Sequence, residues 1–383
     1  MNDEIKEYTT PSGKVRYRFT VYIGKDEATG NSKQIRKQGY KTKEEAEQAF
    51  LEYKLKVVNG DYKKEKQGHV KFSKFIAEWL PMYKPTVKES TYATTLRLID
   101  NHIKKDLGNL YLDKISVERC QKIAVKWSEV SPKVFKRYVT YTAKILDYAV
   151  HLELIPSNPM KKIIMPKRKI EAKEFTNFYT KDELDKYLFW AKDYSFKAFC
   201  FFRLMSFTGM RKGEVLALRW SDINFNNGTL RVERTVTKGI NERLLISTPK
   251  TPHSIRSIPV DQQTLKYLLE WKKAQRGDII QIGGNALDAE QLIFSNSLNK
   301  PCDPYIITKW NKAITDRHHL RRITIHGFRH THASLLFEAG VSMEEVKERL
   351  GHSTIKTTMD IYTHVTKAKK KETAQTFAKF MEA

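Results

Sequence analysis

The stretch that decides the fold around the expected site runs from His326 to Tyr362 and reads HGFRHTHASLLFEAGVSMEEVKERLGHSTIKTTMDIY. Within it, Ser342 and Glu345 have the spacing of a capping box, so a helix should begin there, and Gly351 should end it. Reactive side chains are spread along the stretch, namely His326, Arg329, His352 and Tyr362. We therefore expect short helical segments that bring these groups into one pocket.

Two further cations lie far upstream, Arg211 in TGMRKGEVLAL and Lys250 in TPKTPHSIRSIPV. The combined set of guanidiniums, an ammonium, imidazoles and a phenol contains no dominating carboxylate. It suits holding an anion, in particular a phosphodiester, because preset cations stabilise the charge that builds on its oxygens during attack. Arginine matches two phosphate oxygens at once and stays charged. A tyrosine, with a pKa of about 10, needs a base or a positive field to become a nucleophile.

In this order and at these spacings the residues resemble the tyrosine recombinases, or phage integrase family, especially the integrases of Gram-positive temperate phages and integrative elements. The family pattern is an arginine in T-G-x-R-x-x-E, a lysine on a hairpin, H-x-x-R, G-H and a following tyrosine. It falls here on Thr208 to Glu214, Lys250, His326 to Arg329, Gly351-His352 and Tyr362. H-x-x-R alone is a weak motif, whereas the complete ordered set is a strong signal.

The resemblance implies how a DNA strand is cut. Tyr362 would attack the scissile phosphate and form a 3′-phosphotyrosine, releasing a 5′ hydroxyl. Arg211, Arg329 and His352 would hold the non-bridging oxygens. Glu214, three residues after Arg211, would buttress that arginine rather than act as an acid.

Proton transfer falls to two other groups. Lys250 would protonate the leaving oxygen, and His326 would take the proton of the tyrosine. The run His326, His330, His332 also invites a metal reading, but zinc sites add a carboxylate, a cysteine or a well-placed third histidine, and Arg329 would repel a cation there. We therefore expect no metal. Because the covalent adduct keeps the bond energy, we expect no cofactor either.

The composition indicates an anionic polymer as partner. The chain has 383 residues, enough for two or three domains, and a formal net charge of +25. Its 3 cysteines lie far apart, which favours neither a disulfide framework nor a cysteine-based zinc site. No run approaches the roughly 18 apolar residues of a membrane span, and the start lacks a signal peptide. We expect a cytoplasmic, nucleoid-associated protein with no membrane partner.

Residues 1–62 should form a small module for arm-type DNA. The segment from Val15 to Ile23 alternates, and the side chains expected to face a core are Val15, Tyr17, Phe19, Val21 and Ile23. Thr42 and Glu45 then open a helix. The resemblance implies a three-stranded sheet whose exposed face binds DNA, with candidate contacts at Arg16, Arg18, Lys33 and Arg36. From the charges alone, a merely solvated face remains an equal alternative.

The rest of the chain should form two larger domains, giving a multidomain α+β protein. Residues 63–162 contain four helix-like segments and should be an all-helical, SAM-like core-binding domain; the segments are Phe72–Tyr83, Ser90–Ile103, Val117–Trp127 and Val134–Leu152. Residues 163–178 read as a basic linker with candidate DNA contacts at Lys167 and Arg168. Residues 179–383 should be a mainly helical catalytic domain with a small antiparallel sheet.

These expectations describe a site-specific DNA recombinase that integrates, and also excises, a phage or mobile element. Its partners would be double-stranded DNA at attachment core sites and arm sites, further copies in a homotetramer, an excisionase and a DNA-bending host factor. Two alternatives stay open. A non-catalytic DNA-binding regulator would leave the clustered site residues unexplained, and a type IB topoisomerase-like enzyme would share the chemistry.

Overall fold

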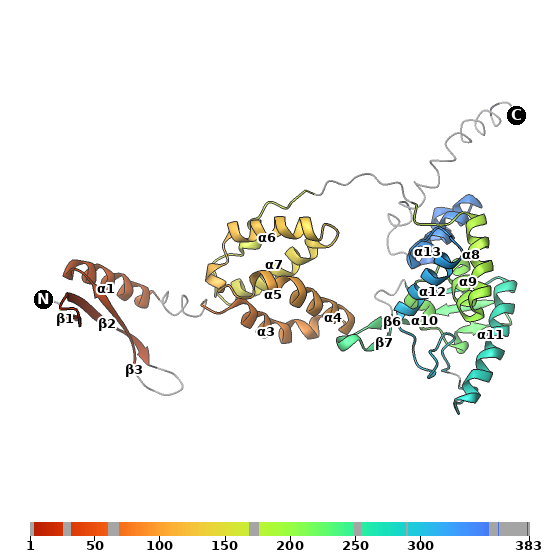
Figure 1. The fold of residues 1–383 in the computed structure, drawn as a ribbon, viewed down its shortest axis with the longest axis horizontal. Coiled ribbons are helices and arrows are strands. Elements are labelled where there is room, and N and C mark those ends of the chain that lie inside the picture. The colour runs from red at the N-terminus through yellow and green to blue at the C-terminus, as the bar shows by residue number, and fades with distance from the viewer. Residues whose placement is uncertain are drawn as a thin grey trace. The chain divides into compact units, whose positions relative to one another are not determined.

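A computed structural model of the chain describes residues 4–25, 32–59, 69–167, 176–248, 254–288 and 290–351, together with residues 359 and 381. The chain divides into two compact units, Met1–Ile170 and Glu171–Ala383, and each is described by itself. Figure 1 labels most of their helices and strands. The finer boundaries expected near residues 62, 162 and 178 stay a prediction.

The N-terminal part is an antiparallel sheet covered by one helix. Its elements are β1 (Ile5–Thr9), β2 (Val15–Lys25), β3 (Ser32–Tyr40) and α1 (Lys43–Val58), with β2 in the middle of the sheet. Phe19 and Val21 of β2 pack with Ala46 and Phe50 of α1. The predicted alternation is confirmed at these positions. It is wrong at Val15, which is 45% exposed because it begins the strand outside that core.

The other face of this sheet is polar and basic. Tyr8 pairs with Arg16 across the strands, and the guanidinium carbon of Arg18 lies 5.5 Å from the centroid of the Tyr8 ring. Arg36 pairs with Thr20 on the neighbouring strand. Since side chains alternate between the faces of a strand, these arginines lie on the face away from α1.

The helical part of the first unit follows the predicted segments closely. Its elements are α3 (Phe72–Tyr83), η1 (Lys84–Thr86), α4 (Glu89–Leu98), the π-turn η2 (Ile99–Ile103), α5 (Lys104–Leu107), η3 (Leu112–Lys114), α6 (Val117–Val130), α7 (Phe135–His151) and η4 (Pro159–Lys162). Aromatic residues contribute to its core: Trp79 stacks on Tyr83 at 4.5 Å between ring centroids, and both are buried.

The second unit is mainly helical and carries two small sheets. Its helices are α8 (Lys181–Tyr194), α9 (Phe196–Thr208), α10 (Lys212–Leu216), η5 (Trp220–Asp222), η6 (Ile240–Glu242), α11 (Gln262–Gln281), α12 (Pro304–Arg317), α13 (Ile325–Glu338) and α14 (Met343–Leu350). Its strands are β4 (Ile223–Asn224), β5 (Thr229–Val232), β6 (Thr235–Lys238), β7 (Leu244–Ser247) and β8 (Arg256–Pro259). They form the antiparallel sheet β4-β5-β8 and the separate ribbon β6-β7, which the sequence did not predict.

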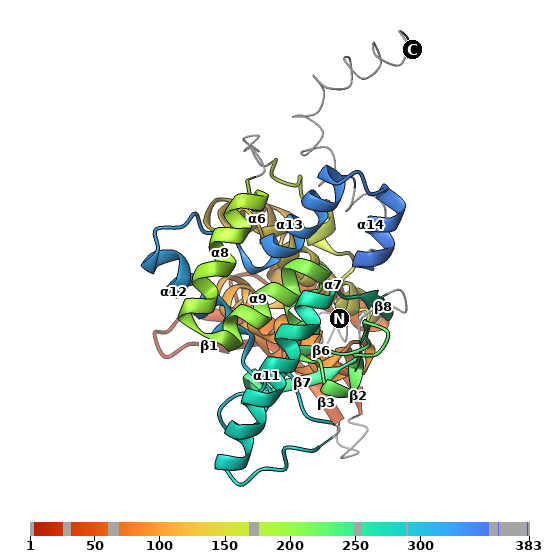
Figure 2. The same ribbon diagram turned by 90° about the vertical axis from the view of Figure 1, so that its right-hand side faces the viewer.

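Helix α9 forms the centre of this unit. It contacts α8, α11 and α13, as Figure 2 shows; most of its residues are buried, and most of the buried ones are apolar. Phe202 of α9 lies 4.9 Å from Phe328 of α13 and 5.2 Å from Tyr187 of α8, measured between ring centroids. This aromatic packing fixes α13, the helix that begins the deciding stretch. Among the described residues, no helix is both long and apolar enough to cross a membrane.

Candidate active site

The site begins where α9 and α14 end beside α13. Gly209 ends α9 and Gly351 ends α14, both in the left-handed conformation with φ of 67° and 66°. A Cβ on Gly209 would lie 2.5 Å from the Leu350 side chain and 2.6 Å from the His332 ring, so only glycine allows this approach. Because the last carbonyls of a helix lack intrahelical donors and carry partial negative charge, the junction presents acceptors to cations.

Arg329 of α13 fills this junction. Its side chain is fully buried at 1% exposure. Nη1 donates to the Gly209 carbonyl and Nη2 to the Leu350 carbonyl, each at 2.7 Å. Burial, together with repulsion from Arg211, lowers the pKa of Arg329 to about 9, so it is still charged at neutral pH. The predicted arginine is therefore a buried cation that joins the two helix ends.

Three successive carbonyls at the end of α14 each accept a hydrogen bond from a different arginine. The pairs are Arg256 Nε to the Arg349 carbonyl at 3.0 Å, Arg329 Nη2 to the Leu350 carbonyl at 2.7 Å, and Arg211 Nη2 to the Gly351 carbonyl at 3.4 Å. We call Arg211, Arg256 and Arg329 the arginine clasp. It brings together residues more than a hundred positions apart, immediately before His352 in the chain.

Glu214 connects two members of the clasp. Arg211 is the N-cap residue of α10; its backbone N–H donates to Glu214 Oε2 at 2.9 Å, and its Nη1 donates to Oε1 at 2.8 Å. Arg256 Nη2 donates to Oε2 at 2.9 Å. Burial by itself would raise the pKa of Glu214, but Arg256 and Arg211 outweigh it and lower that pKa. Glu214 is thus a buried carboxylate that orients Arg211, in the arrangement expected of a buttress.

His326 lies one turn before Arg329 on α13. By area the residue is exposed, but the packing around its ring partly desolvates it, and this desolvation with the charges of Arg329 and Arg211 lowers its pKa. Its ring meets that of His330 edge to face at 4.6 Å between centroids. Burial first, then the neighbouring His326 and the charge of Arg329, lower the pKa of His330 to about 4. Both imidazoles are therefore neutral at neutral pH and able to accept a proton.

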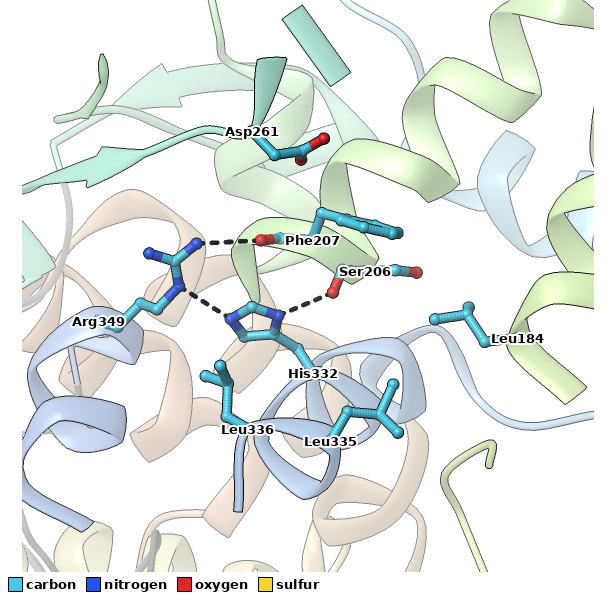
Figure 3. A pocket seen from close by; sticks show the side chains of 8 residues that line it. All are labelled: Leu184, Ser206, Phe207, Asp261, His332, Leu335, Leu336 and Arg349. Carbon is cyan, nitrogen blue, oxygen red and sulfur yellow. Dashed lines mark hydrogen bonds between the residues drawn. The ribbon is translucent and has the colours of Figure 1, made fainter. Parts of the chain in front are cut away.

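A cavity of about 300 Å³ lies next to Arg349, whose carbonyl accepts from Arg256 of the clasp, and Figure 3 shows the side chains that line this cavity. Four helices and the N-cap of α11 line it, through Leu184, Ser206, Phe207, Asp261, His332, Leu335, Leu336 and Arg349. Arg349 Nε donates to His332 Nε2 at 3.1 Å, so His332 Nδ1 carries the hydrogen and donates to the Ser206 carbonyl at 2.8 Å. Burial, with repulsion from Arg349, lowers the pKa of His332 to about 3. His332 is thus a buried, hydrogen-bonded helix residue.

The predicted site residues divide into two groups. Arg211, Glu214, His326 and Arg329 are described, and they come together within the second unit. Lys250, His352 and Tyr362 lie outside the described residues, although Gly351 directly precedes His352. Sequence reasoning missed Arg256 and Arg349.

The predicted DNA contacts belong to the first unit. Arg16, Arg18 and Arg36 lie on the polar sheet face, and Lys33 of β3 pairs with Gly24 of β2. Lys167 is the last described residue before a gap, and Arg168 lies outside the described residues.

Three family models match the chain. The phage integrase family matches residues 177–369, its N-terminal SAM-like domain matches residues 71–128, and an arm DNA-binding domain matches residues 7–57. The first match alone covers half of the chain. The class of protein is therefore that of the tyrosine recombinases, and the chain belongs to the phage integrase family.

Curated relatives are similar to this chain along nearly its whole length. A tyrosine recombinase XerC-like protein of Caldanaerobacter subterraneus is 33% identical over 95% of this chain and 96% of its own. The ICEBs1 integrase of Bacillus subtilis is 29% identical over 94% of this chain and 96% of its own. The enzyme is a tyrosine-type site-specific recombinase.

Solved structures share the fold. The integrase of transposon Tn1549, bound to transposon right end DNA, matches with a TM-score of 0.64 at 19% identity, covering 80% of this chain and 100% of that one. The lambda integrase tetramer bound to a Holliday junction matches with a TM-score of 0.58 at 16% identity, covering 94% of each chain. The predicted multidomain α+β fold is confirmed.

Proposed function

We propose that this recombinase integrates a phage or mobile element into DNA, and excises it, with Tyr362 as the nucleophile. One observation carries the proposal: Arg329 and Arg211 hold the carbonyls of Leu350 and Gly351, the two residues before His352. Two guanidiniums are thereby held at the end of α14; His352 is the next residue in the sequence, and Tyr362 follows ten residues after it. Such a cluster suits a phosphate whose negative charge grows during attack.

The two arginines contribute differently. The side chain of Arg211 is 38% exposed, so its guanidinium can meet a non-bridging oxygen directly. Arg329 is buried below it, and its charge acts in a medium of low dielectric, where an electrostatic contribution is larger than in water. His352 would add a hydrogen bond to the same phosphate.

Proton transfer would use His326 and Lys250. The neutral form of His326 favoured by its lowered pKa is the form that accepts the proton of Tyr362 as the phenol attacks. Attack forms the bond between the phenol oxygen and phosphorus and breaks the bond to the 5′ oxygen, which Lys250 would protonate. The resulting 3′-phosphotyrosine is later attacked by the 5′ hydroxyl of a partner strand, so no cofactor takes part.

The partners follow from the same reaction. Two duplexes exchange four strands, so four protomers would assemble on double-stranded DNA at the attachment core sites. The lambda relative forms a tetramer on a Holliday junction, which supports this proposal. The basic sheet face with Arg16, Arg18, Lys33 and Arg36 would bind arm sites, and Lys167 and Arg168 would touch the backbone beside the core site. An excisionase, a DNA-bending host factor and a cytoplasmic, nucleoid-associated location belong to the same proposal.

A nicked suicide duplex carrying the core site of the element tests the proposal. Loss of the short fragment beyond the nick traps the covalent adduct, which runs as a slower band on a denaturing gel. The wild-type chain should form this adduct, and Tyr362→Phe should bind the duplex without forming it. Binding without any adduct on the cognate site would support the regulator instead. Relaxation of plasmids that lack the site would support the topoisomerase.

A further inference from the structure

We propose that Arg256 is a positioning residue of this recombinase, which keeps the charge of Arg211 available to the phosphate by sharing the carboxylate of Glu214. The inference rests on the proposed function of Arg211 and Arg329. Arg256 itself is the first residue of β8. Its side chain is 7% exposed and that of Glu214 is 3% exposed, so they form a buried ion pair.

The hydrogen bonds of Arg256 reach three segments of the unit. Nη2 donates to Glu214 Oε2 at 2.9 Å, Nε donates to the Arg349 carbonyl at 3.0 Å, and Nη1 donates to the Ser254 carbonyl at 3.1 Å. These acceptors belong to α10, to the end of α14 and to the segment before β8. Arg256 therefore ties the helix that begins at Arg211 to the helix end that leads to His352.

The charge balance of the clasp explains why a third arginine is needed. Glu214 accepts from Arg211 at 2.8 Å, and an ion pair this close cancels most of the field that Arg211 presents to a ligand. Arg256 supplies a second cation to the same carboxylate. Among these four residues, three guanidiniums and one carboxylate leave two net positive charges. The phosphate develops about two negative charges as the tyrosine attacks, so the balance matches the transition state.

Removal of Arg256 would leave Glu214 to Arg211 alone. The remaining ion pair would be neutral, and the cluster would keep only the charge of Arg329. Binding of long duplex DNA, which depends on many phosphates, should hardly change. The chemical step should slow, because it depends on the local charge at a single phosphate.

The test compares two substrates in single-turnover cleavage by the full chain. One is the nicked suicide duplex, and the other carries a neutral methylphosphonate at the scissile position. Arg256→Gln should slow adduct formation on the phosphodiester by at least about tenfold. Its defect should shrink on the methylphosphonate, because the uncharged linkage develops less negative charge. Arg256→Lys, which keeps the cation, should recover most of the rate.

Two further variants distinguish the loss of a charge from damage to the local structure. Glu214→Gln removes the carboxylate, so the double variant Glu214→Gln/Arg256→Gln should cleave faster than Arg256→Gln alone. If Arg256→Gln does not fold, the double variant is compared with Glu214→Gln instead. Its rate of adduct formation should be less than about threefold below that of Glu214→Gln. Arg234→Gln, which removes an arginine from another ion pair of the same unit, should cleave as the wild type does.

The proposal is overturned if Arg256→Gln cleaves the phosphodiester as fast as the wild type. It is also overturned if its defect is the same on both substrates and is not relieved by Glu214→Gln, since Arg256 would then be purely structural. Failure of the proposed function is a distinct result, because the wild-type chain would then form no tyrosine adduct on either duplex.

Discussion

Arginine serves two regions of this chain in opposite surroundings. In the arginine clasp, Arg329 and Arg256 are buried, and their N–H groups are directed at carbonyls and a carboxylate. On the N-terminal sheet, Arg18 and Arg36 are exposed on the face away from α1. A buried guanidinium has a fixed place and an unscreened charge, whereas the charge of an exposed one is screened by salt. The clasp should therefore control the chemical step, and the sheet should control binding to DNA.

The largest effect on the rate of cleavage is expected from a substitution in the buried arginine clasp. Arg329→Gln should reduce the rate of adduct formation by about a hundredfold or more, because a buried cation whose field stabilises the developing charge is lost. It also leaves the Gly209 and Leu350 carbonyls without their donor, which should lower the free energy of unfolding by about 1–3 kcal/mol. Single-turnover cleavage below the melting temperature measures the first effect, and denaturant titration measures the second. Equal loss of arm-site binding would contradict the division between the two regions.

The histidine beside the clasp should make stability depend on pH. The pKa of His332 is about 3 in the folded chain and about 6.5 when unfolded, so the unfolded state binds its proton more tightly. The stability that this histidine contributes is complete above pH 6.5 and is lost as the pH falls towards its folded pKa. Between pH 7 and pH 4.5 the loss should be about 2–3 kcal/mol.

Denaturant titrations of the full chain across this pH range check the expectation. His332→Gln should flatten the acid side of the curve. The exposed His319 provides the control, because His319→Asn keeps a residue that tolerates its φ of 51° and should leave the slope unchanged. A curve that His332→Gln does not alter would show that the buried imidazole is not responsible.

The exposed arginines of the N-terminal sheet should affect DNA binding but not the rate of cleavage. Arg16→Ala or Arg18→Ala should weaken binding to arm-site duplex and reduce the salt dependence of that binding by about one phosphate contact each. Cleavage of the core-site suicide duplex should stay at the wild-type rate. Fluorescence anisotropy over a series of salt concentrations gives the slope. Parallel loss of arm binding and core cleavage would remove the distinction between the regions.

The smallest effect concerns the cap of α8 in the catalytic unit. Thr180 and Glu183 form a capping box, so Thr180→Ala should cost about 1 kcal/mol of unfolding free energy. Thr42→Ala, at the corresponding cap of α1, should instead destabilise the N-terminal part. Proteolysis followed by mass spectrometry shows which part opens in each variant. A change in the cleavage rate well below the melting temperature would mean that the cap also shapes the site.

Local patterns sufficed for the four helical segments of residues 63–162 and for the helix that Ser342 begins, but α11 and α12 were not predicted. The helical stripes from Phe72 onwards, the caps at Thr180 and Ser342, and the glycine stops at Gly209 and Gly351 all depend on residues close in the chain. The β6-β7 ribbon was missed because its strands lack a clear alternation of buried and exposed side chains.

The clasp itself could be predicted only in part. Motif spacing identified Arg211, Glu214, His326 and Arg329, but the bonds to three successive carbonyls of α14 join segments far apart in sequence. Arg256 carried a readable signal, since it lies two residues before the buried Ile258 and therefore faces the same side of its strand. What no local pattern supplied was its partner, because the pairing with Glu214 depends on tertiary packing.

The most direct test of the central claim is to map the covalent adduct on the protein. The wild-type chain is trapped on the nicked core-site duplex, digested with nuclease and protease, and analysed by mass spectrometry. The account predicts one peptide that carries a nucleotide on Tyr362, strongly depleted in Arg329→Gln. An adduct on another residue, or undiminished modification of Tyr362 in Arg329→Gln, would contradict it.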